Sequence, residues 1–590
     1  MNITKKHLKG GEYLTENAAP ETAFTPEDFD DELKLIAQTT EEYVENEVRP
    51  VMDRLEKLEP GLSEQLMEKA GELGLLAIEI PEEYGGVNLS KTAATVVAEY
   101  SAGSSGFNTT ISSHSTIGTL PLVYFGTLEQ KQKYLTKLGS GEWVGAYALT
   151  EPGAGSDALG GTTKAELSDD GKHYILNGSK MWISNAGFAK LFTVFAKVDG
   201  DRKKFSAFLV ERDWQGVSTG AEEKKMGIKS SSTRQVMFEN VKVPVENLLG
   251  EIGQGAKIAF NILNTGRFKL GASCVGAAKR ILAIAAAYAQ ERQQFGVPIA
   301  SFGMIREKLA EMALRTYVAE SACYRTVGMI DAMISEDKSL QNQLKSIEEY
   351  AVECSFIKVL GSELIDFAAD ETVQIHGGYG YSADYEIEKI YRDARINRIY
   401  EGTSEINRLL MPGMLLKRAM RGELQLLKTM PESGNGKRTV QLQAENALSV
   451  LSQEALLILG LKKTVLMVLG QAAKHFGTEL EKEQELLGRI ADMMMGTYAA
   501  ESAMLRTIKL HGRGKDTTLL QAMTQAYTHR VAGQSASWAR EALSRFLDGD
   551  ALQQQSAMIT NLLTQTNTNA IALRRQIAAA VLKVNGYPVF

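Results

Sequence analysis

The sequence predicts a mainly helical protein of the α+β class, in which one block of short strands separates helical domains. Apolar residues recur at helical spacing through residues 29–52 and over long stretches after residue 253. Between these, residues 192–198, 205–210 and 236–243 alternate or cluster as β-strands. Beyond residue 440 a further helical block repeats part of the preceding one. We therefore expect an N-terminal helical domain, a small β-barrel or sandwich, a helical bundle and a degenerate second helical domain.

Composition narrows the class of protein. A chain of 590 residues is too long for one core, and 44% hydrophobic with 23% charged residues is ordinary for a globular protein. No run of eighteen apolar residues and no apolar N-terminal segment occur, so we expect neither a spanning helix nor a secretory signal. The three cysteines form no Cys-x-x-Cys pair and the seven histidines are scattered, which predicts neither disulfides nor a metal site. A cytoplasmic location fits these features best.

Charge is distributed unevenly along the chain. Residues 421–590 carry 19 basic and 14 acidic side chains, whereas the whole chain has a net charge of −7. This excess is too mild for a nucleic-acid-binding domain. It leaves room for weak peripheral contact with an anionic membrane, at its inner face.

The domain order follows from changes in the residue pattern along the chain. Thr25-Pro26-Glu27-Asp28 is typical of a helix start, helical patterning gives way to strands at Tyr147, and long helices resume at Gly253. Residues 431–436 contain proline, serine and two glycines, as a linker would. We expect an N-terminal extension and five further segments: 1–29, 30–146 (helical), 147–252 (β), 253–428 (helical, with the chemistry), 429–443 (linker) and 444–590 (helical).

An internal repeat defines the C-terminal block. Residues 316–322 (Thr-Tyr-Val-Ala-Glu-Ser-Ala) match residues 497–503 (Thr-Tyr-Ala-Ala-Glu-Ser-Ala) at an offset of 181. Arg325-Thr326 recurs as Arg506-Thr507 and Phe295-Gly296 as Phe476-Gly477 at the same offset. This indicates a degenerate second copy of the preceding helical domain. At this offset Glu401 corresponds to Leu582, so the copy should serve in packing or docking.

One carboxylate stands out in the stretch Tyr400-Glu401-Gly402-Thr403-Ser404-Glu405. Gly402 would let the backbone approach a ligand closely. Glu401 could act as a general base if burial raises its pKa from about 4.3 toward neutrality. The alternative is a surface loop with a capping threonine, and the stretch alone does not decide between the two.

Two further stretches could form parts of a cofactor-binding site. Residues 149–157 contain Gly153-Ala154-Gly155 with flanking hydroxyls, whose backbone N–H groups could face an anion or a polar ring edge. In residues 180–185, Trp182 and Ser184 could cover a flat cofactor and hydrogen-bond its edge. A plain β-turn and a core tryptophan are the respective alternatives.

Five motifs together resemble those of the acyl-CoA dehydrogenase family of flavoproteins, in family order over residues 30–420. They are Thr-Glu-Pro-Gly-Ala-Gly-Ser-Asp (150–157), Lys-Met-Trp-Ile-Ser-Asn (180–185), Glu-Arg-Gln-Gln-Phe-Gly (291–296), Gln-Ile-His-Gly-Gly (374–378) and Tyr-Glu-Gly-Thr (400–403). The C-terminal extension, with residues 264–267 and 301–305, is most similar to the very-long-chain branch. Asn264 departs from the aspartate that many relatives carry.

The resemblance implies FAD as cofactor and an acyl-CoA thioester as substrate. Glu401 would remove a proton from the acyl α-carbon while the β-hydrogen leaves as hydride to the flavin, and the Glu401 backbone N–H would help polarise the thioester carbonyl. Residues implied at the cofactor are Tyr147, Leu149, Thr150, Gly155, Ser156, Trp182, Ser184, Arg292, Phe295, Gln374, Gly377, Gly378, Thr403 and Glu405. Residues implied at the substrate are Ser156, Asn264, Arg267, Tyr400 and Gly402.

The resemblance also implies partners. Arg292, Phe295, Gln374, Gly377 and Gly378 match positions that reach the cofactor from a neighbouring subunit, which implies a homodimer. Electrons would pass to an electron-transferring flavoprotein as part of fatty acid β-oxidation. Small residues at Ser112 and Ser113 predict a deep acyl pocket and long-chain substrates. The alternatives are an acyl-CoA oxidase of the same fold, which uses oxygen, and a non-catalytic assembly or docking relative.

Overall fold

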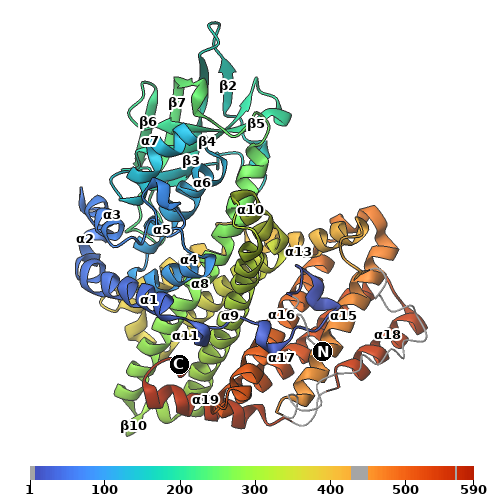
Figure 1. Ribbon diagram of the computed structural model, residues 1–590. Coiled ribbons are helices and arrows are strands. Elements are labelled where there is room, and N and C mark those ends of the chain that lie inside the picture. Colours follow the sequence, from blue (N-terminus) through green and yellow to red (C-terminus); the bar gives the residue numbers. More distant parts are fainter. Residues whose placement is uncertain (1–6, 427–449, 565–567, 590) are drawn as a thin grey trace.

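The computed structural model describes residues 7–426, 450–564 and 568–589, and it confirms the predicted fold class. Figure 1 shows a β region at one end of the molecule, long helices running down the middle, and a second helical block at their side. The predicted linker, residues 429–443, lies entirely outside the described residues.

The N-terminal region is built from short helices. They are α1 (Asp31–Tyr43), α2 (Met52–Glu56), α3 (Leu62–Glu72), α4 (Lys91–Tyr100), α5 (Phe107–Ser112), α6 (Leu120–Phe125) and α7 (Leu128–Gly139). The prediction of a helix beginning at Thr25 was wrong in its start and its continuity. Thr25 caps only a 3₁₀ turn, and α1 begins after Asp30, whose side chain accepts from the Leu33 N–H. The helix is then interrupted by a π turn and a 3₁₀ turn at Pro50, which lacks an N–H donor.

One eight-stranded sheet forms the β region. Its strands are β1 (Gly145–Ala148), β2 (Lys164–Leu167), β3 (His173–Ser184), β4 (Leu191–Val198), β5 (Phe205–Glu211), β6 (Val217–Glu222), β7 (Thr233–Pro244) and β8 (Leu248–Leu249). The order is β6-β7-β3-β2-β4-β5-β8, and β1 pairs in parallel with β4. Two register shifts interrupt the pairing of β3 with β7, and the second lies between Lys180 and Ile183.

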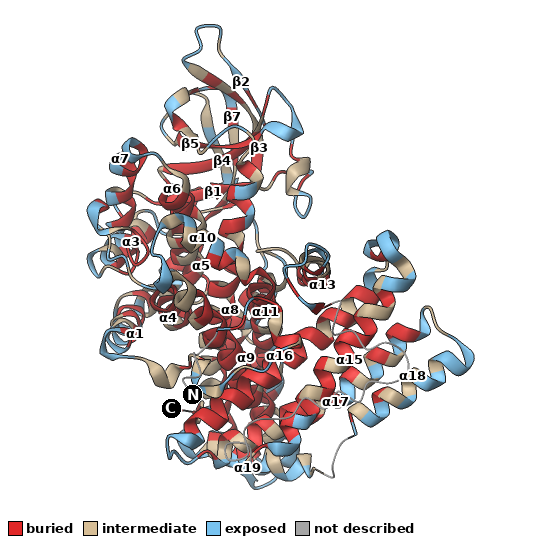
Figure 2. Ribbon diagram, turned by 45° about the vertical axis from the view of Figure 1, so that its right-hand side comes forward, coloured by how far each residue is buried: buried red, intermediate tan, exposed pale blue. Residues whose placement is uncertain are grey.

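Long helices follow the sheet. They are α8 (Gly255–Glu291), α9 (Gly303–Glu336), α10 (Leu340–Glu349), α11 (Ala351–His376), α12 (Glu386–Ala394) and α13 (Ser404–Met420). A hairpin of β9 (Gln293–Gln294) and β10 (Val297–Pro298) links α8 to α9. Figure 2 shows α8, α9 and α11 as largely buried. At about 1.5 Å per residue, the 37 residues of α8 extend about 55 Å, so this helix passes several parts of the site.

Within the described residues the C-terminal block has five helices. They are α15 (Ser452–Phe476), α16 (Gln484–Gly512), α17 (Thr518–Ser544), α18 (Gly549–Leu562) and α19 (Ala570–Val584). Of these, α16, α17 and α19 contact α9, and α16 also contacts α13. This block is therefore joined to the helical domain of the same chain.

The contacts between α9 and α16 are reciprocal. Arg325 pairs with Glu501 at 2.8 Å, and Arg506 pairs with Glu320 at 2.6 Å. Arg506 is the repeat counterpart of Arg325, and Glu501 is the repeat counterpart of Glu320, both at the offset of 181. The tyrosines behave likewise: the Tyr317 hydroxyl lies 2.7 Å from that of Thr507, and the Tyr498 hydroxyl lies 2.8 Å from that of Thr326. The repeated residues thus form an approximately twofold-symmetric interface inside one chain.

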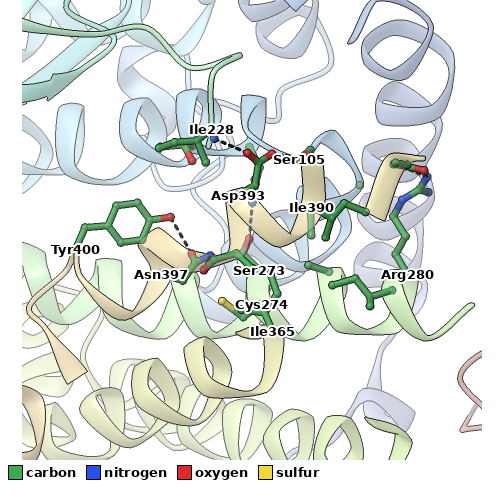
Figure 3. Close-up of a pocket in the computed structure, with 18 residues that line it drawn as sticks. Ser105, Ile228, Ser273, Cys274, Arg280, Ile365, Ile390, Asp393, Asn397 and Tyr400 are labelled. Atoms are coloured by element: carbon green, nitrogen blue, oxygen red, sulfur yellow. Dashed lines mark hydrogen bonds and ion pairs between the residues drawn. The ribbon is translucent and has the colours of Figure 1, made fainter. Parts of the chain in front are cut away.

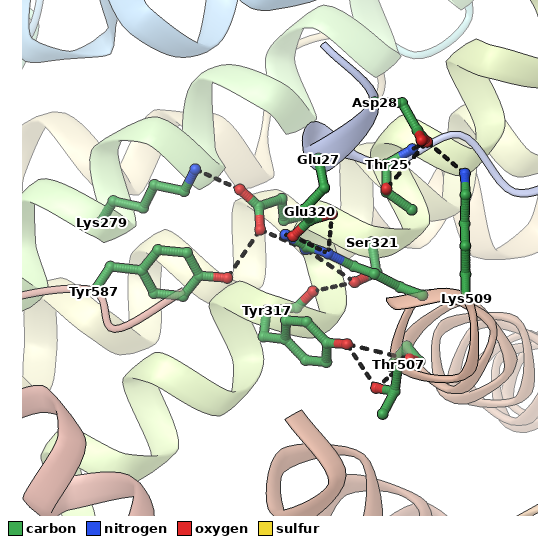
Figure 4. Close-up of polar contacts among 12 residues, drawn as sticks. Thr25, Glu27, Asp28, Lys279, Tyr317, Glu320, Ser321, Thr507, Lys509 and Tyr587 are labelled. Carbon is green, nitrogen blue, oxygen red and sulfur yellow. Dashed lines mark hydrogen bonds and ion pairs between the residues drawn. The ribbon is translucent and has the colours of Figure 1, made fainter. Parts of the chain in front are cut away.

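The N-terminal extension contacts α16 and stabilises this interface. Glu27 lies 2.6 Å from Arg506 and Asp28 lies 2.5 Å from Lys509, as Figure 4 shows together with the Tyr587 hydroxyl on Glu320. The buried Tyr13 hydroxyl donates to the Met494 carbonyl at 3.2 Å. Because the Arg506–Glu320 pair is almost wholly buried, removal of one of these two partners should cost about 3–5 kcal/mol of folding free energy.

Two described helices have the length and composition of membrane-crossing segments. They are Gly255–Glu291 and Ser452–Lys482, and 50% and 72% of their most apolar windows are buried inside the protein. Core helices pass the same test, so this observation carries no membrane assignment.

Candidate active site

Glu401 lies in a strained turn that enters α13. Both Glu401 and Gly402 have left-handed backbone conformations, with φ of 56° and 81°. The Asn407 amide donates to the carbonyls of Gly402 at 2.9 Å and Thr403 at 3.0 Å. The Thr403 hydroxyl accepts from the Ile406 N–H at 3.1 Å and caps the helix. The threonine cap is therefore real, and it helps hold the glutamate in a conformation that a non-glycine residue rarely adopts.

The carboxylate of Glu401 is buried and poorly paired. Its Oε2 atom has no hydrogen-bond partner among the described residues. Gly266 on α8 makes room for it, because a Cβ there would lie 2.6 Å from Oε2. Burial raises the pKa of Glu401 to about 7, although the positive charges of Arg267 and Lys358 act in the opposite direction. This pKa suits a general base near neutral pH.

Asn264 and Arg267 lie on α8 beneath this turn. The Arg267 Nη1 donates to Asn264 Oδ1 at 2.8 Å, and its Nε donates to the Glu401 carbonyl at 3.4 Å. Both side chains are buried. Their predicted contact with the substrate stays a prediction, and in the described structure they support the backbone of Glu401.

A narrow cavity begins beside the same turn. It encloses about 60 Å³ and is lined by Tyr400, Thr109 and Cys274 at one end and by Arg280 and Glu386 at the other. Figure 3 shows Tyr400 and Arg280 at opposite ends of the lining residues. The lining residues are spread out between Tyr400 and Arg280 in Figure 3, and an elongated arrangement of this kind suits one extended chain.

The cavity wall corrects one detail of the sequence interpretation. Asn108 and Thr109 line the cavity from α5, whereas Ser112 and Ser113, one turn later, do not. The Ser112 hydroxyl instead donates to Asn108 Oδ1 at 3.3 Å. Residues four apart share a helix face, so Ser112 and Ser113 lie one turn further along the face that carries Asn108 and Thr109, outside the lining residues.

The two predicted cofactor stretches are held together by a buried ion pair. Glu151 lies 2.7 Å from Lys180, and both side chains are almost fully buried. Burial alone would raise the pKa of Glu151, but Lys180 and hydrogen bonds from Thr163 and Thr162 lower it to about 2. Sequence reasoning missed this pair, although both residues lie inside motifs that it singled out.

This pairing sets the surface on which Trp182 lies. The Met181 N–H donates to the Thr150 carbonyl at 2.9 Å. Trp182 falls in the second β3 register shift, has a φ of 60° and leaves 54% of its surface exposed. It is therefore not a core tryptophan. Tyr147 and Leu149 are buried at the end of β1, Ser184 ends β3 half-buried, and Gly155 and Ser156 are exposed.

A second cluster gathers the other predicted cofactor residues. Arg292 lies over the Tyr379 ring at 5.2 Å, and Arg292, Gly377 and Gly378 line a cavity of about 810 Å³. Gln374 at the end of α11 is exposed, and Phe295 at the hairpin leaves 93% of its surface exposed with a φ of 52°. An exposed phenylalanine in a left-handed conformation is costly unless something covers it.

The two clusters are far apart in one chain. Gly266, beside Glu401, and Arg292 are 26 residues apart, which along α8 corresponds to about 39 Å. Figure 1 likewise places β10 at the opposite end of the long helices from the sheet. One chain therefore does not bring the Arg292 cluster to Glu401.

A buried lysine and the Glu405 carboxylate complete the description. Lys358 is fully buried with no hydrogen-bond partner for Nζ among the described residues, and burial lowers its pKa to about 8. Its charge acts on Glu401. The sequence did not indicate that Lys358 is buried beside Glu401, because a lysine in a helix is usually exposed to solvent. Glu405, at the start of α13, has its pKa lowered by hydrogen bonds at the helix start.

Comparison with known proteins places these features in a family. Residues 30–142, 146–241 and 253–414 match the sequence families described as acyl-CoA dehydrogenase N-terminal, middle and C-terminal domains, and residues 460–561 match a further one described as acyl-CoA dehydrogenase, C-terminal domain. The chain is 46% identical to a probable acyl-CoA dehydrogenase of Bacillus subtilis, over 98% of both proteins. It is 35% identical to the human mitochondrial very long-chain specific acyl-CoA dehydrogenase, over 93% of this chain and 87% of that protein.

Solved structures show the same fold. An acyl-CoA dehydrogenase from Bacillus anthracis, complexed with FAD, has a TM-score of 0.93 and 47% identity, and the match covers 99% of this chain and 100% of that one. Butyryl-CoA dehydrogenase from Megasphaera elsdenii has a TM-score of 0.60 and 34% identity, and covers 66% of this chain and 99% of that one.

Proposed function

Because the chain belongs to the acyl-CoA dehydrogenase family, we propose that it converts saturated long-chain acyl-CoA into trans-2-enoyl-CoA in fatty acid β-oxidation. It is an enzyme of this family, and FAD is its cofactor. The observation that carries the proposal is Glu401, a buried carboxylate with a pKa of about 7 and an oxygen without a hydrogen-bond partner among the described residues, whose neighbour Tyr400 lines one end of a narrow cavity.

The chain's own residues supply the proton transfer. Glu401 takes the proton of the acyl α-carbon, and the electron pair of that C–H bond forms the new double bond as the β-hydrogen departs with its own pair. FAD, when bound, supplies the acceptor for this hydride. The burial that raises the pKa of Glu401 also excludes water, which strengthens the polarisation of the thioester carbonyl by backbone N–H groups. The strained turn fixes the carboxylate so that no reorganisation is needed at the reacting carbon.

The residues present fit a flat dinucleotide cofactor. The exposed Trp182 and the half-buried Ser184 lie side by side on β3, and the buried Tyr147 hydroxyl has no partner among the described residues. A Cβ at Gly155, Gly377 or Gly378 would meet nothing within 4 Å, so the backbone is open to a ligand at all three positions. Thr150, Ser156, Thr403 and Glu405 would provide further polar contacts.

Homodimerisation is part of the proposal. The Arg292 cluster contains residues suited to a phosphate-rich ligand, yet lies about 39 Å along α8 from Gly266. A second copy of the chain would bring its Arg292, Phe295 and Gln374 to the cofactor of the first and cover the exposed phenylalanine.

The electron acceptor in this proposal is an electron-transferring flavoprotein, in the cytoplasm or weakly held at the inner face of the membrane. An acyl-CoA oxidase of the same fold is the competing function.

Anaerobic bleaching of the flavin spectrum tests these functions. Purified protein is mixed with acyl-CoAs of 4 to 20 carbons, and absorbance is followed before and after admission of air. Bleaching that persists in air until an electron-transferring flavoprotein is added supports the proposal, whereas rapid reoxidation in air indicates an oxidase. Absence of bleaching with every acyl-CoA would refute the proposed function.

A further inference from the structure

The end of the narrow cavity opposite Tyr400 is closed by an ion pair. Arg280 on α8 donates through Nη2 to both oxygens of Glu386 on α12, at 3.0 and 3.1 Å. Both residues line the cavity. Their outer sides face solvent, since 25% of the Arg280 side chain and 44% of the Glu386 side chain are exposed. The pair therefore stands between the cavity and bulk water.

Helix α8 forms one wall along the whole cavity. Its lining residues Ser273, Cys274, Ala277, Arg280 and Ile281 recur at intervals of three and four, which places them on one face. Gly266, two turns before Cys274 on the same helix, lies against the Glu401 carboxylate. A chain that passes Glu401 and enters the cavity would follow α8 toward Arg280.

We propose that the Arg280–Glu386 ion pair is the end wall of the acyl pocket and sets the longest acyl chain that the pocket encloses. This inference rests on the proposed function. Methylenes beyond the pair would have to displace two charged side chains or extend into water, so they would contribute no further burial.

The helix also gives the length of the pocket. Gly266 and Arg280 are 14 residues apart, or about 21 Å along α8, and the side chain of Arg280 tilts back by up to about one turn of 5 Å. An extended alkyl chain advances about 1.25 Å per carbon, given a bond of about 1.5 Å and an angle near 111°. The path from Glu401 to the pair therefore matches the length of about 13 to 17 extended carbons, which corresponds to acyl groups of roughly 14 to 18 carbons.

Two variants move the wall in opposite directions. Arg280→Ala removes the long side chain and should open the end, so that kcat/KM for a 20-carbon acyl-CoA relative to a 12-carbon one rises at least about tenfold. Ala277→Phe places a ring one turn nearer Glu401, about 4.5 Å along the helix. It should shorten the preferred chain by about three or four carbons. Both changes should appear mainly in KM, at about fourfold per methylene, which corresponds to about 0.8 kcal/mol.

The matched control is Glu388→Ala. Glu388 lies in the same first turn of α12 and pairs with Arg392 at 2.6 Å, but it does not line the cavity. Its loss should leave the chain-length profile unchanged. Variants are compared as flavin-loaded protein with acyl-CoAs of 8 to 22 carbons.

The failures of the two proposals are distinguishable. If the parent protein bleaches with acyl-CoAs but Arg280→Ala and Ala277→Phe both keep its chain-length profile, the end wall is wrong and the proposed function stands. If Glu388→Ala shifts the profile as Arg280→Ala does, the effect comes from α12 as a whole and the end wall is equally wrong. If the parent does not bleach at all, the proposed function itself fails.

Discussion

Replacing Glu401 by glutamine should make the protein more stable as it abolishes turnover. Burial raises the pKa of Glu401 from an ordinary 4.5 to about 7. Between these values the folded state binds more protons than the unfolded state, so the free energy of unfolding falls as pH rises. The loss begins near pH 4.5 and is complete above pH 7, and at about 1.4 kcal/mol per pKa unit it amounts to about 3 kcal/mol. Glutamine carries no charge, so the free energy of unfolding of the variant does not fall in this way as pH rises.

The expected shift in melting temperature follows from size. An unfolding entropy of about 2.1 cal/mol/K per residue gives about 1.2 kcal/mol/K for the 590-residue chain. Glu401→Gln should then melt about 2–3 °C above the parent at pH 8 and at nearly the same temperature at pH 4.5. Bleaching by acyl-CoA should slow by at least roughly 10²–10⁴-fold, because the amide cannot accept the α-proton. Calorimetry of flavin-loaded proteins from pH 4.5 to 8 measures the first effect, and stopped-flow absorbance the second.

Glu353 on α11 provides a matched control. It is also fully buried, burial raises its pKa to about 7, and one of its oxygens lacks a partner among the described residues. It lies at the N-terminal extension, where the Gly11 N–H donates to it at 2.8 Å. Glu353→Gln should therefore gain stability over the same pH range and still bleach. A Glu401→Gln protein with no gain at pH 8, or with the bleaching rate of the parent, would refute the reasoning.

The remaining predictions concern the neighbours of Glu401 and the C-terminal block. Lys358→Met removes a positive charge that lowers the pKa of Glu401, so the pH midpoint of the bleaching rate should move upward and the rate at pH 7 should fall; an unchanged midpoint counts against this. Gly266→Ala puts a Cβ 2.6 Å from the Glu401 carboxylate and should lower kcat at least about tenfold, whereas Gly413→Ala, with nothing within 4 Å, should not. A chain ending at Leu426 should expose the α9 face and self-associate into tetramers or aggregates in light scattering, and a well-behaved dimer would contradict this.

Much of this structure was readable from sequence because local pattern and local structure agree. The strands predicted at 192–198, 205–210 and 236–243 correspond to β4, β5 and β7. The turn at Glu401 was found because glycine and a capping threonine carry local signals. The fold class, the family and FAD as cofactor are confirmed, whereas the cofactor contacts of individual residues stay predictions.

Other features depend on contacts that no local pattern records. The Glu151–Lys180 pair joins residues 29 positions apart, and Lys358 acts on Glu401 from another helix. The exposure of Trp182 depends on the β3 register shift, which periodicity does not predict. The cavity is lined one turn before Ser112 on α5, because the extent of a cavity along a helix depends on which elements pack against that helix. These are tertiary effects that override local signals.

The α9–α16 interface limits where a second copy of the chain can bind. A twofold-symmetric interface is self-complementary, so the face of α9 that carries Glu320 and Arg325 could in principle pair with another α9. In this chain α16 already occupies that face with the same residue types, and its charges are buried and paired. Association between chains must therefore use another surface. The exposed Phe295 and the Arg292 cluster, at the far end of α8, form the surface whose burial would both cover apolar area and complete the cofactor site.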